Sequence, residues 1–228
     1  MEKNTLYAKF KFEKQDEELV NLLEDYINQN AERIFEFFDS SLERKPLEIE
    51  IIPTKKEYDE RQKERRGVDE IPKWSVGVYF DNKIEYVSLN DYQNTAHAYT
   101  EENYEEALEY YKKTILHEFT HYVLKLYIEK HNNDEPLKYL NEGIAQYLSG
   151  QRENQVFDFK YSLDDILNNK DCYPGWYLMV NYILEEYSRN YFLKLLVHND
   201  LALSETPYLY EEVKEYYEEL KQESVKRK

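Results

Sequence analysis

Two histidines four residues apart enclose a glutamate in the segment His117-Glu118-Phe119-Thr120-His121. Because an α-helix turns by about 100° per residue, side chains at positions i and i+4 lie on the same helical face. The spacing therefore predicts that both imidazoles face one metal ion. Glu118 flanks the pair, where its carboxylate could reach a water molecule on that metal without being a ligand. This arrangement suits zinc-dependent hydrolysis.

A second motif supplies a candidate for a third ligand. The segment Leu140–Tyr147 reads L-N-E-G-I-A-Q-Y and places Glu142 on the next predicted helix after His121. Catalytic zinc sites use three protein ligands and leave a fourth position to water or substrate. The sequence therefore predicts that His117, His121 and Glu142 bind Zn²⁺ together.

The two motifs resemble those of the gluzincins of the peptidase MA clan. Thermolysin-like and aminopeptidase-N-like members pair an HExxH helix with a downstream helix of the N-E-G-x-A-x-Y type. The similarity is greatest to the small peptidase-MA-like domains, and it includes the W-x-x-G segment Trp74–Gly77. This resemblance implies a zinc metallopeptidase in which Glu118 is the general base and returns the proton to the leaving amine.

The resemblance also implies a tyrosine that stabilises the oxyanion of the tetrahedral intermediate. In aminopeptidase-N-like enzymes this tyrosine begins a helix beyond the glutamate ligand, and the segment Cys172–Val180 looks like that region. Tyr173 is the first choice and Tyr177 the alternative. The chain contains 24 tyrosines, so a packing or surface role is about as common for either one.

The sequence departs from both groups at two places. Thermolysin-like enzymes have an acidic residue four positions after the glutamate ligand, whereas this chain has Gln146, whose amide oxygen could accept the same hydrogen bond from a zinc histidine. Aminopeptidase-N-like enzymes bind the substrate's α-amine with a glutamate on an edge strand, but Val76–Phe80 contains no acid. We therefore expect cleavage of internal bonds, with Gly77 and Val78 binding an extended peptide through the main chain.

The elements that position these residues follow from hydrophobic periodicity. Alternating apolar residues predict strands near residues 6–12 and 47–51, and a hairpin is expected from runs 75–80 and 84–89 around Asp81-Asn82-Lys83. Helical spacing covers residues 16–42, and Thr54 followed by Glu57 predicts a capped polar helix to about residue 66. The first hundred residues therefore predict an α+β arrangement.

After residue 100 the pattern becomes helical. Apolar residues from Tyr104 to Leu126 recur at steps of three and four, and further helices are expected near residues 137–148, 162–168, 176–187 and 211–223. We predict the α+β fold class and a single gluzincin catalytic domain over residues 1–228. It would be zincin-like, with an N-terminal lobe over about 1–131 that has a small mixed sheet, a helical lobe over about 132–228, and the active-site helix between them.

Composition limits the partners. Lys and Arg number 30 against 47 Asp and Glu, a formal net charge of −17, which argues against binding nucleic acid. No apolar run approaches the ~20 residues of a membrane span, and the first ten residues lack the apolar core of a signal peptide. We expect a cytoplasmic protein with a peptide or protein substrate and no membrane partner.

The remaining candidate residues have simpler explanations. His97, His131 and His198 show no ligand spacing with one another, so solvated or structural roles are favoured. Cys172 is the only cysteine and is expected to be a small buried residue rather than a nucleophile. Two alternatives to a peptidase remain open at this point. One is a zincin-fold protein that binds a peptide or partner without cleaving it, and the other is a zinc amidohydrolase acting on a non-peptide amide.

Overall fold

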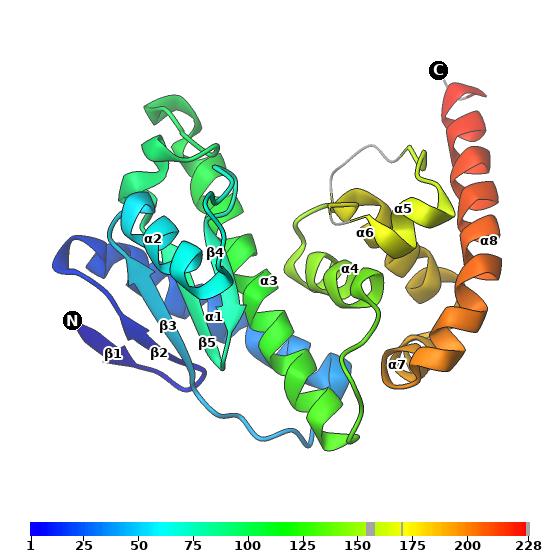
Figure 1. Cartoon of the computed structure of the whole chain (residues 1–228), viewed down its shortest axis with the longest axis horizontal. Coiled ribbons are helices and arrows are strands. Elements are labelled where there is room, and N and C mark those ends of the chain that lie inside the picture. Colours follow the sequence, from blue (N-terminus) through cyan, green and yellow to red (C-terminus); the bar gives the residue numbers. More distant parts are fainter. Residues whose placement is uncertain (154–157, 170, 227–228) are drawn as a thin grey trace. The chain divides into compact units, whose positions relative to one another are not determined.

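The computed structural model describes residues 1–153, 158–169 and 171–226. The chain forms two compact units, Met1–Val123 and Leu124–Lys228, and the division falls inside helix α3 (Tyr104–Lys130) (Figure 1). The fold is α+β, as the sequence predicts, with a small mixed sheet in the first unit. Within the described ranges, no helix combines the length and the apolar character needed to cross a membrane.

One mixed sheet organises the first unit. Its five strands among the described residues are β1 (Glu2–Asn4), β2 (Ala8–Lys11), β3 (Leu47–Ile52), β4 (Gly77–Phe80) and β5 (Lys83–Val87). The order is β1-β2-β3-β5-β4, in which β3 runs parallel to β2 and β5 while the outer pairs are antiparallel. Asp81 and Asn82 both have positive φ in the predicted hairpin turn. This order makes β4 an edge strand.

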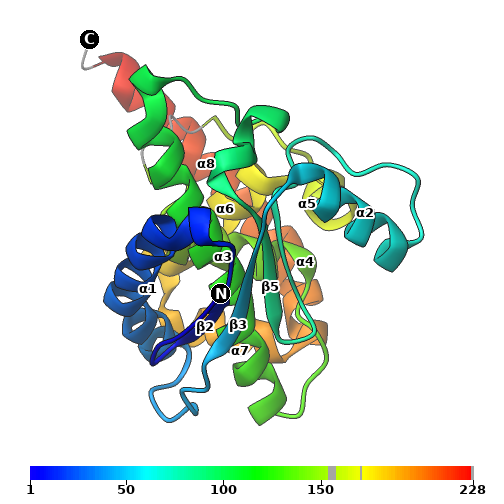
Figure 2. The ribbon, with the colours of Figure 1, turned by 90° about the vertical axis from the view of Figure 1, so that its left-hand side faces the viewer.

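The apolar face of the sheet supports α1 (Glu17–Phe38) and α3. Phe10 and Ile49 are buried on this face, and the ring of Phe35 in α1 lies 6.2 Å from that of Phe119 in α3. Helix α1 lies on one side of the sheet and α2 (Lys55–Arg66) on the other (Figure 2). The 3₁₀ turns of this unit are Lys14–Asp16, Leu89–Asn94 and Glu101–Asn103. Aromatic packing against the sheet therefore fixes the helix that carries the histidines.

The opposite face of the sheet is charged and is covered by α2. The predicted cap is present, since the Thr54 hydroxyl accepts from the Glu57 N–H at 3.2 Å. The buried carboxylate of Glu85 accepts from Gln62 at 3.0 Å and from Arg65 at 2.8 Å. Polar pairing of this kind satisfies a buried charge, so α2 is attached by ionic contacts rather than by an apolar stripe.

The second unit is helical. It contains α4 (Lys138–Ser149), α5 (Leu163–Asn168), α6 (Tyr173–Tyr182), a π-helical turn (Ile183–Tyr187), α7 (Arg189–Val197) and α8 (Asn199–Lys226). Trp176 of α6 is fully buried, and its indole N–H donates to the Ile166 carbonyl at 2.9 Å. The Tyr139 and Thr206 hydroxyls of α4 and α8 lie 2.9 Å apart. These contacts join α4, α5, α6 and α8 into one packed group.

Some element boundaries differ from the predicted ones. Leu6 is 63% exposed because residues 5–8 form a tight turn, with Thr5 N–H donating to the Ala8 carbonyl, so the strand begins at Ala8. Strand β1 and helix α7 were not predicted. Helix α8 begins at Asn199 and continues through Pro207, so it is much longer than the predicted residues 211–223.

Candidate metal centre

The two histidines of α3 face each other. Their Nε2 atoms lie 3.1 Å apart, and their ring planes meet at 83° with centroids 4.7 Å apart. Two nitrogens bound to one zinc ion at about 2.05 Å in tetrahedral geometry would be about 3.3 Å apart. The pair His117 and His121 therefore has the spacing of two ligands on a shared ion.

Helix α3 holds the pair because it is buried on more than one side. Ile115, Leu116, Phe119 and Thr120 have no exposed surface, and His117 itself is buried. A helix packed all round cannot rotate about its axis without losing these contacts. The direction in which the imidazoles point is therefore set by the core.

Glu142 of α4 completes the group. One ligand atom from each of His117, His121 and Glu142 lies within 4.8 Å of the others, so the three side chains could hold a metal ion. Two neutral imidazoles and one carboxylate form a donor set that suits a catalytic zinc ion and leaves a coordination position for water. The residues therefore fit the predicted cofactor, while the identity of the ion stays a prediction.

A glycine next to Glu142 lets α4 lie very close to α6. A Cβ atom on Gly143 would stand 2.5 Å from the Trp176 carbonyl oxygen and 2.5 Å from Val180 Cγ2. Real Cβ contacts of that length do not occur, so any other residue would push the two helices apart. The glycine of the N-E-G motif thus has a packing reason, and it fixes the backbone beside Glu142.

The hydrogen bonds of Gln146 join α4 to the start of α6. Its amide nitrogen donates to the Tyr173 carbonyl at 3.0 Å and to the Glu142 carbonyl at 3.3 Å. Its amide oxygen accepts from Nε of Arg152. The oxygen expected to accept from a zinc histidine is thus used by Arg152, and Gln146 serves instead to position Tyr173.

Glu118 is held by the edge strand of the sheet. Its Oε2 accepts the backbone N–H of Tyr79 in β4 at 2.7 Å. A carboxylate offers about four lone-pair sites, so one such bond orients the group and leaves further acceptor capacity. Tyr79 was not singled out in the sequence, because a backbone N–H has no residue signature.

The register of the hairpin explains why Tyr79 is available. Val87 N–H donates to the Val76 carbonyl at 2.8 Å, and hydrogen-bonded and non-hydrogen-bonded pairs alternate along an antiparallel ladder. The peptide groups of Val78 therefore point toward β5, whereas those of Gly77 and Tyr79 point to the outer edge. Of the two predicted peptide-binding residues, Gly77 faces that edge and Val78 faces inward.

Gly77 has a packing role of its own. A Cβ atom at this position would lie 2.2 Å from the ring of Tyr86, the cross-strand neighbour. Tyr86 is fully buried and its ring packs edge-on against Tyr111 of α3 at 4.5 Å. The structure thus requires glycine here for internal packing, whereas the sequence suggested close approach of a peptide.

The two candidate oxyanion donors lie one turn apart on α6. Tyr173 is the first residue of the helix and is half-buried, with its ring 5.0 Å from that of Trp176. Tyr177 is 4% exposed, and burial raises the pKa of its phenol to about 12. Tyr177 therefore stays a protonated hydrogen-bond donor near neutral pH, whereas the greater exposure of Tyr173 favours it as the group that a substrate reaches.

The other titratable candidates have structural surroundings. His97 stacks on Tyr110 with ring centroids 4.7 Å apart, and His131 Nδ1 lies 2.8 Å from the Tyr127 carbonyl oxygen. Cys172 is buried, which raises the pKa of its thiol to about 11 and keeps it protonated. A thiol of this kind is not an activated nucleophile.

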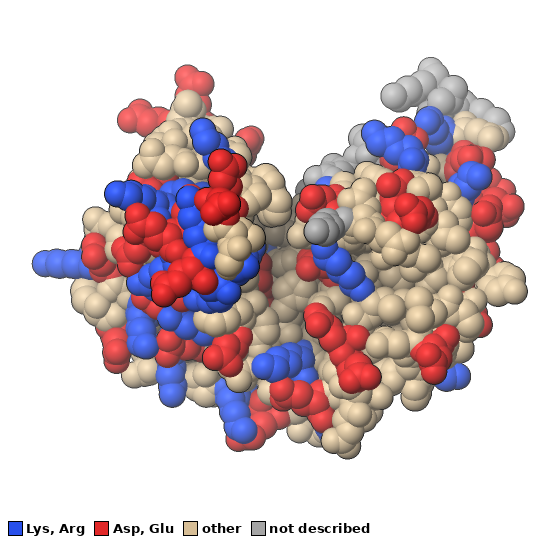
Figure 3. All heavy atoms as spheres, viewed as in Figure 1, with Lys and Arg blue, Asp and Glu red and all other residues tan. Residues whose placement is uncertain are grey.

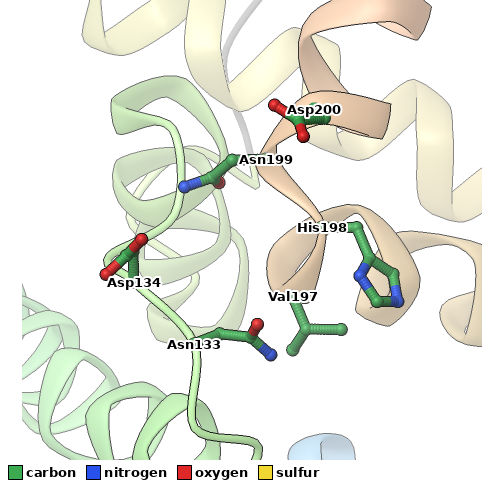
Figure 4. A pocket seen from close by; sticks show the side chains of 6 residues that line it. All are labelled: Asn133, Asp134, Val197, His198, Asn199 and Asp200. Carbon is green, nitrogen blue, oxygen red and sulfur yellow. The ribbon is translucent and has the colours of Figure 1, made fainter.

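His198 is exposed at the end of α7, beside a shallow pocket at the start of α8 (Figure 4). The pocket is lined by Asn133, Asp134, Val197, His198, Asn199 and Asp200. Among the described residues, the group with metal-ligand spacing is His117, His121 and Glu142, and the side chains of this pocket do not converge in that way. The pocket therefore offers no second metal centre.

No family model matches this chain, and no curated protein matches it.

Proposed function

We propose that this chain is a zinc-dependent metallopeptidase of the gluzincin type with a zincin-like, two-lobed fold. The observation that carries the proposal is the group formed by His117, His121 and Glu142, whose ligand atoms lie within 4.8 Å of one another. The two motifs support it, because HExxH puts Glu118 next to His117 in the sequence and N-E-G contains Glu142. A purely structural zinc site would be closed by a fourth protein ligand and would not need this base.

The chemistry divides among the side chains of the site. A zinc ion held by the three ligands would supply Lewis acidity and lower the pKa of water near it toward ~7. Glu118, oriented by the Tyr79 N–H, takes a proton from the attacking water and delivers it to the leaving amine. Tyr173 donates a hydrogen bond to the developing oxyanion, with Tyr177 as the alternative, a contribution of roughly 10²–10³ in rate.

The substrate in this proposal is an extended peptide cleaved at an internal bond. The outward peptide groups of Gly77 and Tyr79 lie along the sheet edge, where a peptide can add as a further strand. The strand Gly77–Phe80 carries no acidic residue that would capture an α-amine. The edge strand therefore favours internal bonds over N-terminal residues.

Metal content tests the ligand assignment most directly. Purified wild-type protein and Glu118→Gln should each hold about one zinc per chain, because Glu118 is not a ligand. His121→Ala and Glu142→Gln should lose the metal and part of the stability that it provides. His198→Ala serves as the matched control, since this histidine is exposed and outside the group. Stoichiometric zinc in His121→Ala would contradict the assignment.

Cleavage tests the reaction. Zinc-loaded protein should cut members of a mixed peptide library, and a chelator should abolish the cutting. If zinc-loaded protein binds peptides and never cuts them, the non-catalytic binding protein is correct instead. If it hydrolyses only non-peptide amides, the metal chemistry stands and the peptidase assignment is wrong.

A further inference from the structure

The edge strand β4 is bordered by two helices of the first unit, and each offers a different chemistry to a peptide lying there. Helix α3 places Glu118 against the Tyr79 N–H, and helix α2 stacks the Arg65 guanidinium 3.3 Å from the centroid of the Phe80 ring. Since Tyr79 and Phe80 are adjacent in β4, the basic end of α2 lies near the same level of the strand as the catalytic carboxylate.

The helical positions of three arginines show which way the last turn of α2 points. Arg61 binds Glu50 of β3 at 3.0 Å, and Arg65 binds Glu85 of β5 at 2.8 Å. At 100° per residue, Arg65 lies 40° further round the helix than Arg61, and Arg66 a further 100° in the same direction. Arg61 also lies 3.7 Å from Glu85, whereas Arg65 contacts both Glu85 of β5 and the Phe80 ring of β4. The contacts thus shift toward β4 around the helix, and we expect the next step to direct Arg66 toward the outer edge of β4.

Arg66 differs from its two neighbours in its surroundings. It is exposed, and among the described residues no carboxylate lies within ion-pair distance of it. Tyr58 of the same helix is fully buried, and burial is the main cause that raises its pKa to about 12. The Tyr58 hydroxyl lies 3.3 Å from Ser75 Oγ, just before β4 begins. Tyr58 therefore attaches α2 to the segment just before β4, about two helical turns from Arg66.

We infer that Arg66 is a specificity residue of the proposed peptidase and binds a substrate carboxylate beside the outer edge of β4. This inference rests on the proposed function for its substrate, an extended peptide. A guanidinium pairs with a carboxylate through two parallel hydrogen bonds, which gives orientation as well as attraction. The carboxylate belongs to an Asp or Glu side chain, or to the C-terminus of the peptide.

The charge distribution of the protein confines the expected preference for a carboxylate to the surroundings of Arg66. The chain has a formal net charge of −17, so an acidic peptide is repelled by the protein as a whole. Lys and Arg side chains gather with Asp and Glu over the unit that holds α2 (Figure 3). In that unit Arg61, Arg65 and Lys83 are paired with glutamates, whereas Arg66 is exposed at the C-terminal end of α2.

Peptide binding to the zinc-loaded Glu118→Gln protein tests the inference without turnover. The probes are labelled decapeptides with one Glu at successive positions, a matched peptide with Gln in its place, and each peptide as free acid and as C-terminal amide. Fluorescence anisotropy should show at least one carboxylate peptide binding about tenfold more tightly than its neutral match. Adding Arg66→Gln should reduce that preference to about twofold or less, and high salt should weaken it in the Glu118→Gln parent.

Lys63→Gln is the matched control, because Lys63 lies in the same last turn and also interacts favourably with the helix dipole. This control should keep the preference, and Arg66→Lys should keep only part of it. Equal binding of acidic and neutral peptides, a preference that survives Arg66→Gln, or no binding of any peptide would each overturn the inference. Arg66-dependent binding without chelator-sensitive cleavage by wild type would instead retain this subsite and remove the peptidase.

Discussion

The two helices that carry the candidate metal ligands are held in different ways. Helix α3 is fixed by large rings: Phe119 packs on Phe35, and the Tyr122 hydroxyl donates to the Lys45 carbonyl at 2.8 Å. Tyr111 adds a hydrogen bond to the Val87 carbonyl at 3.0 Å. The spacing of the two histidines is a property of one helix turn, so it needs only that α3 stays helical.

Helix α4 is held instead by close backbone packing at a glycine, which has no side chain. Gly143 lets its backbone approach α6, and Gln146 bonds the Tyr173 carbonyl across the same contact. Such close packing positions the helix precisely, but it does not tolerate a larger residue, because one methyl group already exceeds the available space. The position of Glu142, the third candidate ligand, should therefore be more sensitive to distant changes than that of the histidine pair.

Glu118→Gln tests the catalytic role of Glu118 without changing the packing of α3, and it should have the largest effect. The amide keeps an oxygen for the Tyr79 N–H, so the helix and the metal should be unaffected. Loss of the general base should lower kcat by about 10³-fold. Peptide turnover measured beside zinc content checks this, and a variant with wild-type kcat would remove Glu118 from the mechanism.

Gly143→Ala should disturb the close packing of α4 against α6. The added methyl would meet Trp176 and Val180 at 2.5 Å, which should cost about 1–3 kcal/mol of stability. Zinc affinity should fall as well, because Glu142 is the adjacent residue. Urea unfolding and zinc titration measure the two effects.

Gly67→Ala is the control for that substitution. Gly67 ends α2 with φ of +63° and nothing within 4 Å of a built Cβ, so its cost is backbone strain of about 1 kcal/mol. Zinc affinity should be unchanged in this control. If both alanines lowered zinc affinity equally, close packing at Gly143 would not explain the position of Glu142.

The sequence predicted the elements of the site better than their connections. The placement of His117 and His121 on one helical face is a local property, so it could be inferred from the helical period alone. The strands β3, β4 and β5 could be inferred from runs of alternating apolar residues and of residues that favour strands. Contacts between residues that are distant in the chain have no such pattern in the sequence. The bond from Tyr79 N–H to Glu118 joins residues 39 apart through a backbone atom that every residue but proline has.

The same limit explains what the sequence missed at Gly77 and in α8. The packing of Gly77 against the ring of Tyr86 could not be read from the sequence, because a glycine in a strand is compatible with close approach of either a side chain or a peptide. The predicted role of Gly77 in peptide binding stays a prediction. The sequence predicted a helix only over residues 211–223, and a proline such as Pro207 normally ends a helix. In the structure α8 runs from Asn199 through that proline, and Ala202, Thr206, Leu209 and Val213 are buried along one face. Burial of that face outweighs the lost hydrogen bond.

Tyr79→Pro tests the edge-strand contribution to Glu118. Proline lacks the N–H, and at this outward position it should leave the ladder with β5 intact. We expect kcat to fall about tenfold, the worth of one charge-assisted hydrogen bond. Tyr79→Ala keeps the N–H and controls for the side chain. Equal kcat in the proline and alanine variants would show that the bond does not orient the base.

Gln146→Leu should have the smallest effect of these substitutions. It tests the hydrogen bonds that Gln146 makes where α4 meets α6. Gln146 is buried, and leucine would remove both the hydrogen bond to the Tyr173 carbonyl and the bond from Arg152 Nε. We expect a loss of about 1–2 kcal/mol in urea unfolding. Gln146→Glu would keep the acceptor for Arg152 and lose the donor to Tyr173. If oxyanion stabilisation depends on Tyr173, both variants should lower kcat while KM changes little, whereas a purely structural Gln146 would change unfolding alone.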